Sequence, residues 1–285
     1  MKILIDGGSG LLGSELTYML KNRHDLEILK GRKDADITDY HGLKKVIANF
    51  HPDVIIHCAG IKDIDFAEKN PSICYEVNVL GTKNMAVITG NLGIPIVHIS
   101  SGSVYDGELG LPYTEFDKPH PVNVYGYSKL IAEENVKAYN RKHFILRLPL
   151  LFGIHGSKER NMIYSMREKL AAGETLSYSV EQICNPTYCM DVAKVIDVMI
   201  DTDAFGTYNI CNSGNASRYE FYTYIAMKLG YSNKSISPVS GDTKYAKREK
   251  NIEFNPIAFQ STFQFRMRDW HEAMDECIKP LVRGL

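Results

Sequence analysis

A tyrosine and a lysine four residues apart form the most informative chemical pair in this chain of 285 residues. Tyr125 and Lys129 lie within residues 124–142, whose pattern predicts a helix, so both side chains share one helix face. A free phenol keeps its proton until about pH 10, and a neighbouring ammonium stabilises the phenolate and lowers its pKa. The spacing therefore predicts a tyrosine that passes a proton to or from a substrate oxygen.

A serine upstream of this pair completes the predicted catalytic set. Ser101 directly follows residues 94–100, an apolar run that predicts a buried strand. Its hydroxyl can donate a hydrogen bond to the same substrate oxygen and steady the charge that develops there. Tyr127 lies on another helix face and has no lysine four residues on, so we do not expect it to be the acid. We predict Ser101, Tyr125 and Lys129 as the catalytic residues.

Three glycines near the N-terminus predict a dinucleotide site. They are spaced G-x-x-G-x-x-G between an expected strand, Lys2–Asp6, and an expected helix over residues 11–22. The first allows a tight turn, the second lets backbone approach a diphosphate, and the third lets the helix pack against the strand. The helix N-terminus adds unpaired N–H donors. The residues expected to contact the dinucleotide are Gly7, Gly10, Leu11, Leu12 and Gly13.

The end of the second expected strand, residues 26–29, indicates which nicotinamide cofactor is used. NAD-binding proteins usually carry an acidic residue there, whereas this chain has Lys30-Gly31-Arg32-Lys33. The Arg32 guanidinium can fork onto a 2′-phosphate. We therefore expect NADP(H) to be preferred over NAD(H), with Asp36 and Ile37 touching the adenine and Lys129 also bonding the nicotinamide ribose.

The order of the expected elements indicates the fold. Unbroken apolar strands alternate with amphipathic helices through the first half, which is typical of a parallel sheet covered on both faces. We expect an α/β fold, namely a Rossmann doubly wound parallel sheet with a smaller C-terminal substrate-binding lobe. The expected division is residues 1–152 with 186–212 for the dinucleotide-binding domain, and 153–185 with 213–285 for the lobe.

Composition excludes several other classes of protein. The net charge of −1 offers no field that would gather nucleic acid or a membrane surface. The six scattered cysteines read as reduced thiols of a cytoplasmic protein, and the nine histidines lack metal-ligand spacing. His57, at a strand end, is expected to be packed rather than to bind a metal. No stretch is apolar enough for a signal-peptide core or a membrane span. We expect a monomer or homodimer.

Two segments carry a resemblance to the extended short-chain dehydrogenase/reductases, and more narrowly to the dTDP-4-dehydrorhamnose reductase family. The family reads I-S-T-D-Y-V-F-D-G and then P-x-N-x-Y-G-x-S-K, and this chain has ISSGSVYDG at 99–107 and PVNVYGYSK at 121–129. Residues 36–39, 56–60, 64–68, 78–84 and 182–188 are similar as well. The resemblance implies reduction of a 4-keto group on a dTDP-linked deoxysugar with NADPH or NADH. It also implies that Cys58, Ala59, Gly60 and Ser100 line the cofactor and that Gln182 and Asn185 contact the substrate.

Departures from the family pattern fall on the substrate side. Ser101 replaces a threonine and keeps the hydroxyl, whereas Gly102-Ser103 replaces an Asp-Tyr pair. Leu150 stands where the family has a tryptophan, and Arg248-Glu249-Lys250-Asn251-Ile252 replaces Arg-Pro-x-x-Ser. Ser103 and Leu150 are thus expected at the substrate, in a pocket that has lost aromatic rings and binds a different sugar or binds it in another pose.

Three functions remain open at this point. The first is a nucleotide-sugar ketoreductase. The second is an epimerase of the same superfamily, which needs a further acid or base near the ring that the sequence does not place. The third is a non-catalytic, NADP-binding regulatory subunit, against which the retained Ser101, Tyr125 and Lys129 argue.

Overall fold

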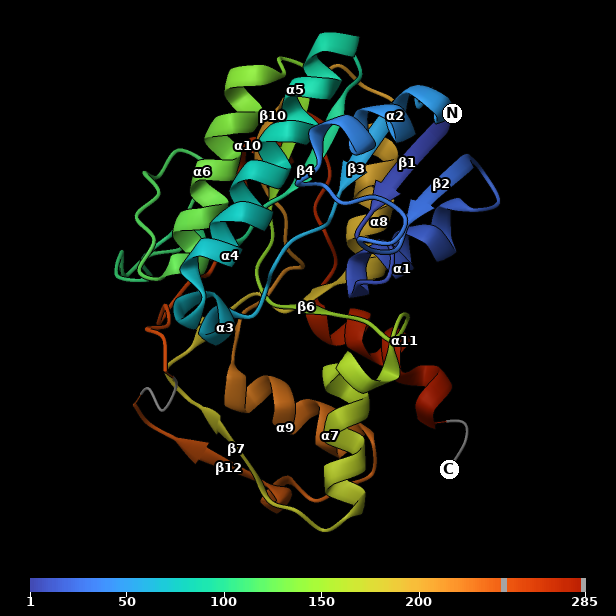
Figure 1. Cartoon of the computed structure of the whole chain (residues 1–285). Coiled ribbons are helices and arrows are strands. Elements are labelled where there is room, and N and C mark those ends of the chain that lie inside the picture. Colours follow the sequence, from blue (N-terminus) through green and yellow to red (C-terminus); the bar gives the residue numbers. More distant parts are fainter. Residues whose placement is uncertain (242–244, 283–285) are drawn as a thin grey trace.

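A six-stranded, wholly parallel sheet forms the centre of the larger part of the molecule. The computed structural model describes residues 1–241 and 245–282. The strand order is β10-β5-β4-β3-β1-β2. The strands are β1 (Lys2–Asp6), β2 (Asp25–Leu29), β3 (Val54–His57), β4 (Ile96–Ile99), β5 (His143–Arg147) and β10 (Gly206–Asn209). This arrangement confirms the predicted doubly wound α/β fold (Figure 1).

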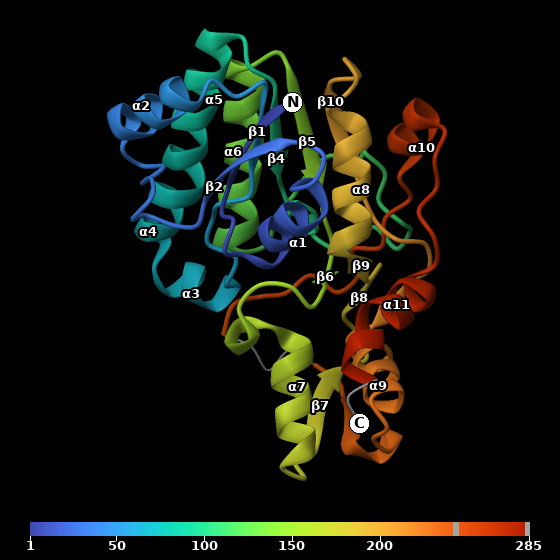
Figure 2. The same cartoon turned by 90° about the vertical axis from the view of Figure 1, so that its right-hand side faces the viewer.

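Alternate residues of the strands face two different layers of helices. On one side, Ile3, Ile56 and Leu146 pack against α1 (Leu11–Leu20) and α8 (Cys189–Met199). On the other, Leu4, Ile55 and Ile145 pack against α2 (Tyr40–Phe50), α5 (Thr82–Leu92) and α6 (Val124–Tyr139). Figure 2 shows α5 and α6 on one side of the sheet and α8 on the other. Burial of both faces explains why these strands read as unbroken apolar runs.

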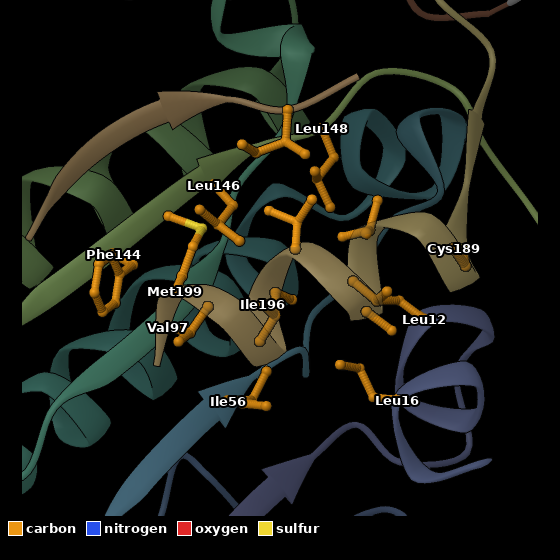
Figure 3. Packing of buried hydrophobic residues seen from close by; sticks show 14 of the residues in the cluster. Leu12, Leu16, Ile56, Val97, Phe144, Leu146, Leu148, Cys189, Ile196 and Met199 are labelled. Atoms are coloured by element: carbon orange, nitrogen blue, oxygen red, sulfur yellow. The ribbon is translucent and has the colours of Figure 1, made fainter. Parts of the chain in front are cut away.

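Helix α8 joins the first core although it lies far along the chain. Its Ile196 and Met199 point toward Val97 and Phe144 of the sheet, beside Leu16 of α1 (Figure 3). Ile196 is fully buried and Met199 is 1% exposed. Its apolar positions at helical spacing therefore face the sheet, as the sequence predicts.

The chain reverses its direction of strand addition between β1 and β3, which are hydrogen-bonded neighbours. Strand β2 lies on one side of β1, and β3, β4 and β5 extend from the other. In open parallel sheets, ligands bind in the crevice at the carboxyl ends of the strands on either side of such a point. The residues that follow β1, β3 and β4 are therefore expected to line a ligand site.

The helical segment 71–92 is interrupted. It consists of α4 (Pro71–Tyr75), a π-helical turn (Glu76–Gly81) and α5. A short helix, α3 (Ile64–Lys69), precedes it and was not expected. Turns of π-helix are costly in hydrogen-bond geometry and are frequent at functional sites. This turn contains Asn78, which is described with the site below.

The smaller part of the molecule has its own core below the sheet in Figure 1. It contains α7 (Met162–Ala171), α9 (Arg218–Lys228) and α11 (Trp270–Val282), together with β7 (Leu176–Ser179) paired to β12 (Ile236–Val239). The other short elements are β6 (Leu151–Phe152), β8 (Ile183–Cys184), β9 (Thr187–Tyr188), β11 (Ala216–Ser217) and α10 (Ile257–Phe263), with 3-10 turns at Gly102–Val104, Lys158–Arg160 and Asn233–Ser235.

Helix α10 does not follow the predicted division between the lobes. Its Phe259 is 2% exposed and belongs to the core of the sheet, as does Met267. The expected lobe of residues 213–285 therefore sends one segment back onto the larger body. The rest of the predicted boundary stays a proposal.

The part of the chain that the structure describes contains neither a membrane-spanning helix nor a cluster of metal-ligand side chains. Within residues 1–241 and 245–282, no helix combines the length and apolar character needed to cross a membrane. Within the same ranges, no three side chains of His, Cys, Asp or Glu are grouped as metal ligands.

Candidate active site

The glycine loop between β1 and α1 exposes mostly backbone, since Ser9 is its one residue with a side chain. Gly7 adopts a φ of 61°, and a Cβ there would lie 2.7 Å from the Ala59 nitrogen. A Cβ on Gly13 would lie 2.5 Å from the Gly7 carbonyl oxygen. Only glycine fits both positions, because the first has left-handed backbone and the second packs directly on the loop. The geometry agrees with the turn and packing roles expected for these two glycines.

The N-terminus of α1 opens toward this loop. Gly10 occupies the N-cap position, and no side chain of the described residues caps the helix. The N–H groups of the first turn, from Leu11 to Gly13, are therefore available to an anion. A glycine-rich loop next to an uncapped helix N-terminus is what a dinucleotide diphosphate requires.

A pocket of about 130 Å³ lies beside the loop and reaches the end of β2. Its lining includes Gly7, Arg32, Asp36, Ile37 and Ala59. The Arg32 side chain is 63% exposed, and its Nε lies 3.5 Å from Asp36 Oδ2. Hydrogen bonds from the N–H and hydroxyl of Thr38, with a smaller effect of Arg32, lower the pKa of Asp36. Asp36 is thus a carboxylate that holds the guanidinium at the pocket wall.

A buried pair, Asp6 and His57, lies between the carboxyl ends of β1 and β3. Asp6 Oδ1 accepts hydrogen bonds from the backbone N–H groups of Cys58 (2.6 Å) and Ala59 (2.9 Å). Its Oδ2 lies 2.5 Å from His57 Nδ1, and His57 Nε2 lies 2.9 Å from the Thr82 hydroxyl. Asp6 therefore fixes the backbone of the predicted cofactor-lining residues, a role that the sequence analysis missed. His57 is packed in this network, in line with the interpretation made from the sequence.

Ser101 and Tyr125 meet at the carboxyl edge of β4. Tyr125 is half-buried near the start of α6, and Ser101 acts to lower the pKa of its phenol. Ser101 Oγ also accepts from the Ser103 N–H at 3.2 Å, which fixes its orientation. A Cβ on Gly126 would lie 2.1 Å from the Ser103 carbonyl oxygen, so the first turn of α6 packs directly on this loop.

Lys129 lies one helical turn beyond Tyr125 and is almost completely buried. Its side chain is 7% exposed, and Nζ donates to the Ile99 carbonyl oxygen at 2.6 Å. Burial lowers its pKa to about 8, while Glu133, Cys58 and Asp6 oppose that shift. At neutral pH the side chain is therefore mostly an ammonium, held at the end of β4.

The acidity of Tyr125 differs from what the sequence predicts. Burial raises its pKa to about 12, with further upward contributions from Glu249 and Cys74, and the Ser101 hydrogen bond works in the opposite direction. Desolvation outweighs the contribution of Ser101, so the pKa of the phenol is raised and not lowered as the Tyr/Lys spacing predicts. In this structure the residue is a phenol at neutral pH, the form that can donate a proton.

Asn78, in the π-helical turn, ties the cofactor side to the catalytic helix. Its Oδ1 accepts from the Ile61 N–H at 2.7 Å, and its Nδ2 donates to the Ile61 carbonyl (3.0 Å) and to the Ser128 hydroxyl (2.9 Å). Ser128 precedes Lys129 and donates to the Tyr125 carbonyl at 2.7 Å. Gly60 lies against Asn78, since a Cβ there would be 3.0 Å from its Oδ1. Residues 78–84 carry the resemblance, but their pattern did not reveal this contact.

Ser100 points into a buried polar network. Its hydroxyl donates to Glu133 Oε1 at 2.5 Å, and Glu133 also pairs with Arg147 through Nε (2.9 Å) and Nη2 (2.7 Å). Arg147 Nη1 donates to the Tyr105 hydroxyl at 2.7 Å. The hydroxyl of Ser100 is thus engaged under the site. Its predicted contact with the cofactor stays a prediction, and it concerns the atoms of Ser100 other than the hydroxyl.

The four residues predicted for the substrate do not form one group with shared contacts. Ser103 is 6% exposed, and it acts to lower the pKa of Glu249. Leu150 packs against the lower core, and the Gln182 carbonyl accepts from the Arg218 N–H at 3.0 Å. Asn185 is 3% exposed, and its amide bonds the Gly214 carbonyl (2.8 Å) and the Phe254 N–H (2.7 Å). Asn185 therefore holds three backbone segments together, and its role at the substrate stays a prediction.

Known proteins similar to this chain agree with the geometry. The family model described as RmlD substrate binding domain matches residues 1–283. The spore coat polysaccharide biosynthesis protein SpsK of Bacillus subtilis is 28% identical over 280 residues, covering 98% of this chain and 97% of the relative. The dTDP-4-dehydrorhamnose reductase of Sinorhizobium fredii is 28% identical, covering 99% of this chain and 98% of the relative.

Solved structures give the same result. The crystal structure of dTDP-4-dehydrorhamnose reductase from Bacillus anthracis, in complex with NADP, superposes with a TM-score of 0.93 at 31% identity, covering 98% of this chain and 99% of that one. The corresponding structure from Clostridium acetobutylicum gives a TM-score of 0.90 at 31% identity, covering 99% of both chains. With a family match over nearly its whole length and this agreement in structure, the chain belongs to the RmlD substrate-binding-domain family.

Proposed function

We propose that this protein is an NAD(P)H-dependent reductase that converts a keto group of a nucleotide-activated sugar into an alcohol. The observation that carries the proposal is that Lys129, one turn beyond Tyr125 on α6, donates to the carbonyl of the last residue of β4, two residues before Ser101. This corner shares the edge of the sheet with the glycine loop and its pocket. Relatives named as dTDP-4-dehydrorhamnose reductases support the reaction class.

Each residue has a definite part in that chemistry. The bound nicotinamide supplies a hydride to the carbonyl carbon, and Tyr125 supplies the proton to the carbonyl oxygen, so that ketone, hydride and proton give the alcohol. Ser101 donates a hydrogen bond to the same oxygen and stabilises its negative charge as it develops. Lys129 holds the first turns of α6 against β4 and offers its ammonium to the cofactor ribose and the phenolate that remains.

For the cofactor we propose a preference for NADP(H). Support comes from Arg32, a largely exposed guanidinium at the end of β2, and from the NADP found in the Bacillus anthracis structure. Asp36 orients Arg32 from within the same pocket. A guanidinium can donate two hydrogen bonds to a phosphate, whereas a carboxylate at this position repels it. The 2′-phosphate of NADP(H) therefore fits beside Arg32.

For the substrate we propose a dTDP-linked 4-keto-6-deoxysugar or a close analogue. A relative from Streptomyces niveus, 29% identical over 240 residues, is named dTDP-4-keto-6-deoxy-D-glucose reductase. Ser103 and Leu150 leave the substrate side without the two aromatic side chains that the resemblance leads one to expect. Different stereochemistry or ring substituents at the sugar are therefore expected to be accepted.

The test is a panel of nucleotide-linked keto sugars with NADPH and NADH. We expect loss of the absorbance of the reduced nicotinamide together with formation of the corresponding alcohol. An isomerised sugar without net consumption of NADPH would replace the proposal with an epimerase. Cofactor binding without turnover on any sugar of the panel, with a co-purifying protein, would replace it with a regulatory subunit.

A further inference from the structure

Two carboxylates of the short helix α3 bind two segments that come from distant parts of the chain. Glu68 Oε2 accepts from the Val124 N–H at 3.0 Å. Asp65 Oδ1 accepts from the Ala246 N–H at 3.0 Å and pairs with Arg248 Nη2 at 2.9 Å. Because the two carboxylates are three residues apart on a helix, they lie on one face of it. Helix α3 therefore holds the start of the catalytic helix α6 with one carboxylate and a C-terminal segment with the other.

These two segments also bind each other, through Asn123. This residue is the N-cap of α6, and its Oδ1 accepts from the Gly126 N–H at 2.8 Å. Its Nδ2 donates to the Lys247 carbonyl oxygen at 3.0 Å and to Glu249 Oε1 at 3.1 Å. The contacts thus close a ring from α3 to the first turn of α6, on to the C-terminal segment and back to α3. We call it the α3 ring, and it consists of Asp65, Glu68, Asn123, Val124 and residues 246–249.

The first turn of α6 carries Tyr125, and the ring supplies acceptors for the N–H groups on both sides of this residue. The first N–H groups of a helix have no partner within the helix, so an acceptor from outside stabilises the turn and fixes its position. Glu68 bonds the residue directly before Tyr125, and Asn123 bonds the residue directly after it. On another side, Gly126 packs on the Ser103 carbonyl oxygen without space for a Cβ. The peptide groups that flank Tyr125 are therefore held from three directions.

The contacts of the two carboxylates are directed at the main chain. Both side chains are partly exposed, and that of Asp65 is 31% exposed. At such exposure an ion pair by itself contributes little to stability. Glu68 and Asp65 each accept from a main-chain N–H, however, which fixes the path of the backbone. The arrangement is suited to placing α6 rather than to stabilising the core.

We propose that Glu68 is a positioning residue for Tyr125, which it holds through the Val124 N–H, and that Asp65 closes the α3 ring from the other side. Proton transfer requires the Tyr125 phenol within hydrogen-bond reach of the substrate oxygen, and a displacement of about 1 Å can slow such a step about a hundredfold. The part that Glu68 plays in catalysis rests on the proposed function. Its hold on the first turn of α6 does not, because that can be measured without a substrate.

The first experiment measures main-chain hydrogen exchange by mass spectrometry in the free protein, on a peptide that covers the first turn of α6. Glu68→Ala removes the acceptor of the Val124 N–H and should make these amides exchange about tenfold faster. Glu68→Gln keeps an oxygen that can accept the same hydrogen bond and should stay within about threefold of the natural protein. Glu76→Ala removes an exposed carboxylate of the neighbouring π-helical turn and serves as the matched control, with no change expected. Exchange in Glu68→Ala equal to that of the natural protein would overturn the inference.

A change at Asp65 tests the ring as a unit. Asp65→Ala removes no contact with α6, so it should speed up exchange in the first turn of α6 only if the C-terminal segment passes its hold on through Asn123. The double variant with Glu68→Ala should show less than the product of the two separate effects, since either change opens the same ring. Unchanged exchange in Asp65→Ala would remove Asp65 from the role assigned here. If Glu68→Ala does not fold, Glu68→Asp takes its place, because it keeps the charge and withdraws the carboxylate by one methylene.

The second experiment separates turnover from cofactor binding. In Glu68→Ala kcat should fall about tenfold or more, while the dissociation constant of NADPH stays the same, because the glycine loop and Arg32 are untouched. Glu68→Gln should restore most of the turnover. An equal loss of kcat and of NADPH affinity would show a general distortion and contradict a positioning role. Faster exchange in Glu68→Ala, in a protein that reduces no keto sugar, would instead leave the hold on α6 intact and overturn the proposed function.

Discussion

Lys129 Nζ donates to the main-chain carbonyl of Ile99 at 2.6 Å, which joins the catalytic helix α6 to the last residue of strand β4. The bond directs a buried ammonium to the edge of the sheet where Ser101 follows two residues later. The lysine therefore sets the position of α6 as well as the charge of the site. Because its pKa is lowered to about 8, its protonation also affects stability.

Replacing Tyr125 by Phe should reduce turnover by roughly two to four orders of magnitude, because it removes the proton donor but keeps the ring. The affinity for NADPH should change little, since the glycine loop and Arg32 are untouched. Steady-state kinetics and a cofactor-binding titration measure the two effects. Tyr127→Phe is the matched control, because Tyr127 is exposed on another face of α6. Equal turnover in Tyr125→Phe and the natural protein would remove Tyr125 from catalysis.

Replacing Arg32 by Ala should weaken NADPH binding about tenfold or more and leave NADH binding nearly unchanged. The reason is that a 2′-phosphate loses its guanidinium partner, whereas NADH has no phosphate there. Dissociation constants for the two cofactors, measured in the same buffer, give the comparison. If both cofactors lose affinity equally, the basic loop does not read the 2′-phosphate.

Replacing Lys129 by Met should change how stability depends on pH. Between about pH 8 and 10.5 the unfolded chain binds the lysine proton more strongly than the folded protein, so the natural protein gains stability as pH rises through this window. Below about pH 8 the cost of burying the ammonium is fully present. The variant lacks this cost, so relative to the natural protein it should be about 2 kcal/mol more stable at pH 7 than at pH 10.

Urea unfolding followed by Trp270 fluorescence measures that difference. Lys137→Met serves as the control, since Lys137 is on the same helix but its side chain is 45% exposed, with a long ion pair of 3.8 Å to Glu133. Its stability relative to the natural protein should stay nearly constant across the same pH range. The prediction is wrong if Lys129→Met shows no more pH dependence than Lys137→Met.

Replacing Glu133 by Gln should destabilise the protein by about 3 kcal/mol or more, because it leaves the Arg147 guanidinium buried without a full counter-charge. Glu133 is fully buried and Arg147 is 3% exposed, so water cannot replace the lost partner. Denaturant unfolding measures the change. Glu134→Gln, an exposed neighbour on α6, should cost almost nothing. Similar costs for both variants would show that the pair adds little beyond a surface charge.

Local sequence patterns were sufficient to predict the strands of the sheet and the central residues of the site. Strands buried on both faces are apolar throughout, so β1, β3 and β4 were visible as short runs, and the glycines at 7, 10 and 13 mark a turn that only glycine can make. Tyr125 and Lys129 share a face because helical periodicity places residues four apart together. These features depend on residues that are close together in the chain, so they can be recognised from the sequence.

The helices of the lower lobe were harder to predict, because their patterns depend on contacts with residues far away in the chain. Helix α9 begins with a capping box, Ser217 with Glu220, which is a local signal, but its apolar residues have little periodicity because aromatic side chains face several partners. The break of residues 71–92 by a π-helical turn also escaped the pattern. Within that break, Asn78 bonds Ile61 and Ser128, which lie 17 and 50 residues away.

The sequence by itself determined the fold class, the glycine turn and the Tyr125/Lys129 pair, because each depends on spacing within a single element. Only the tertiary structure decided the electrostatics of the site. It brought Glu249 beside Asn123, which is 126 residues away in the chain, and it placed Tyr125 where desolvation raises the pKa of the phenol. Charge and solvent act through space, so the acidity of a catalytic group cannot be read from its neighbours in sequence.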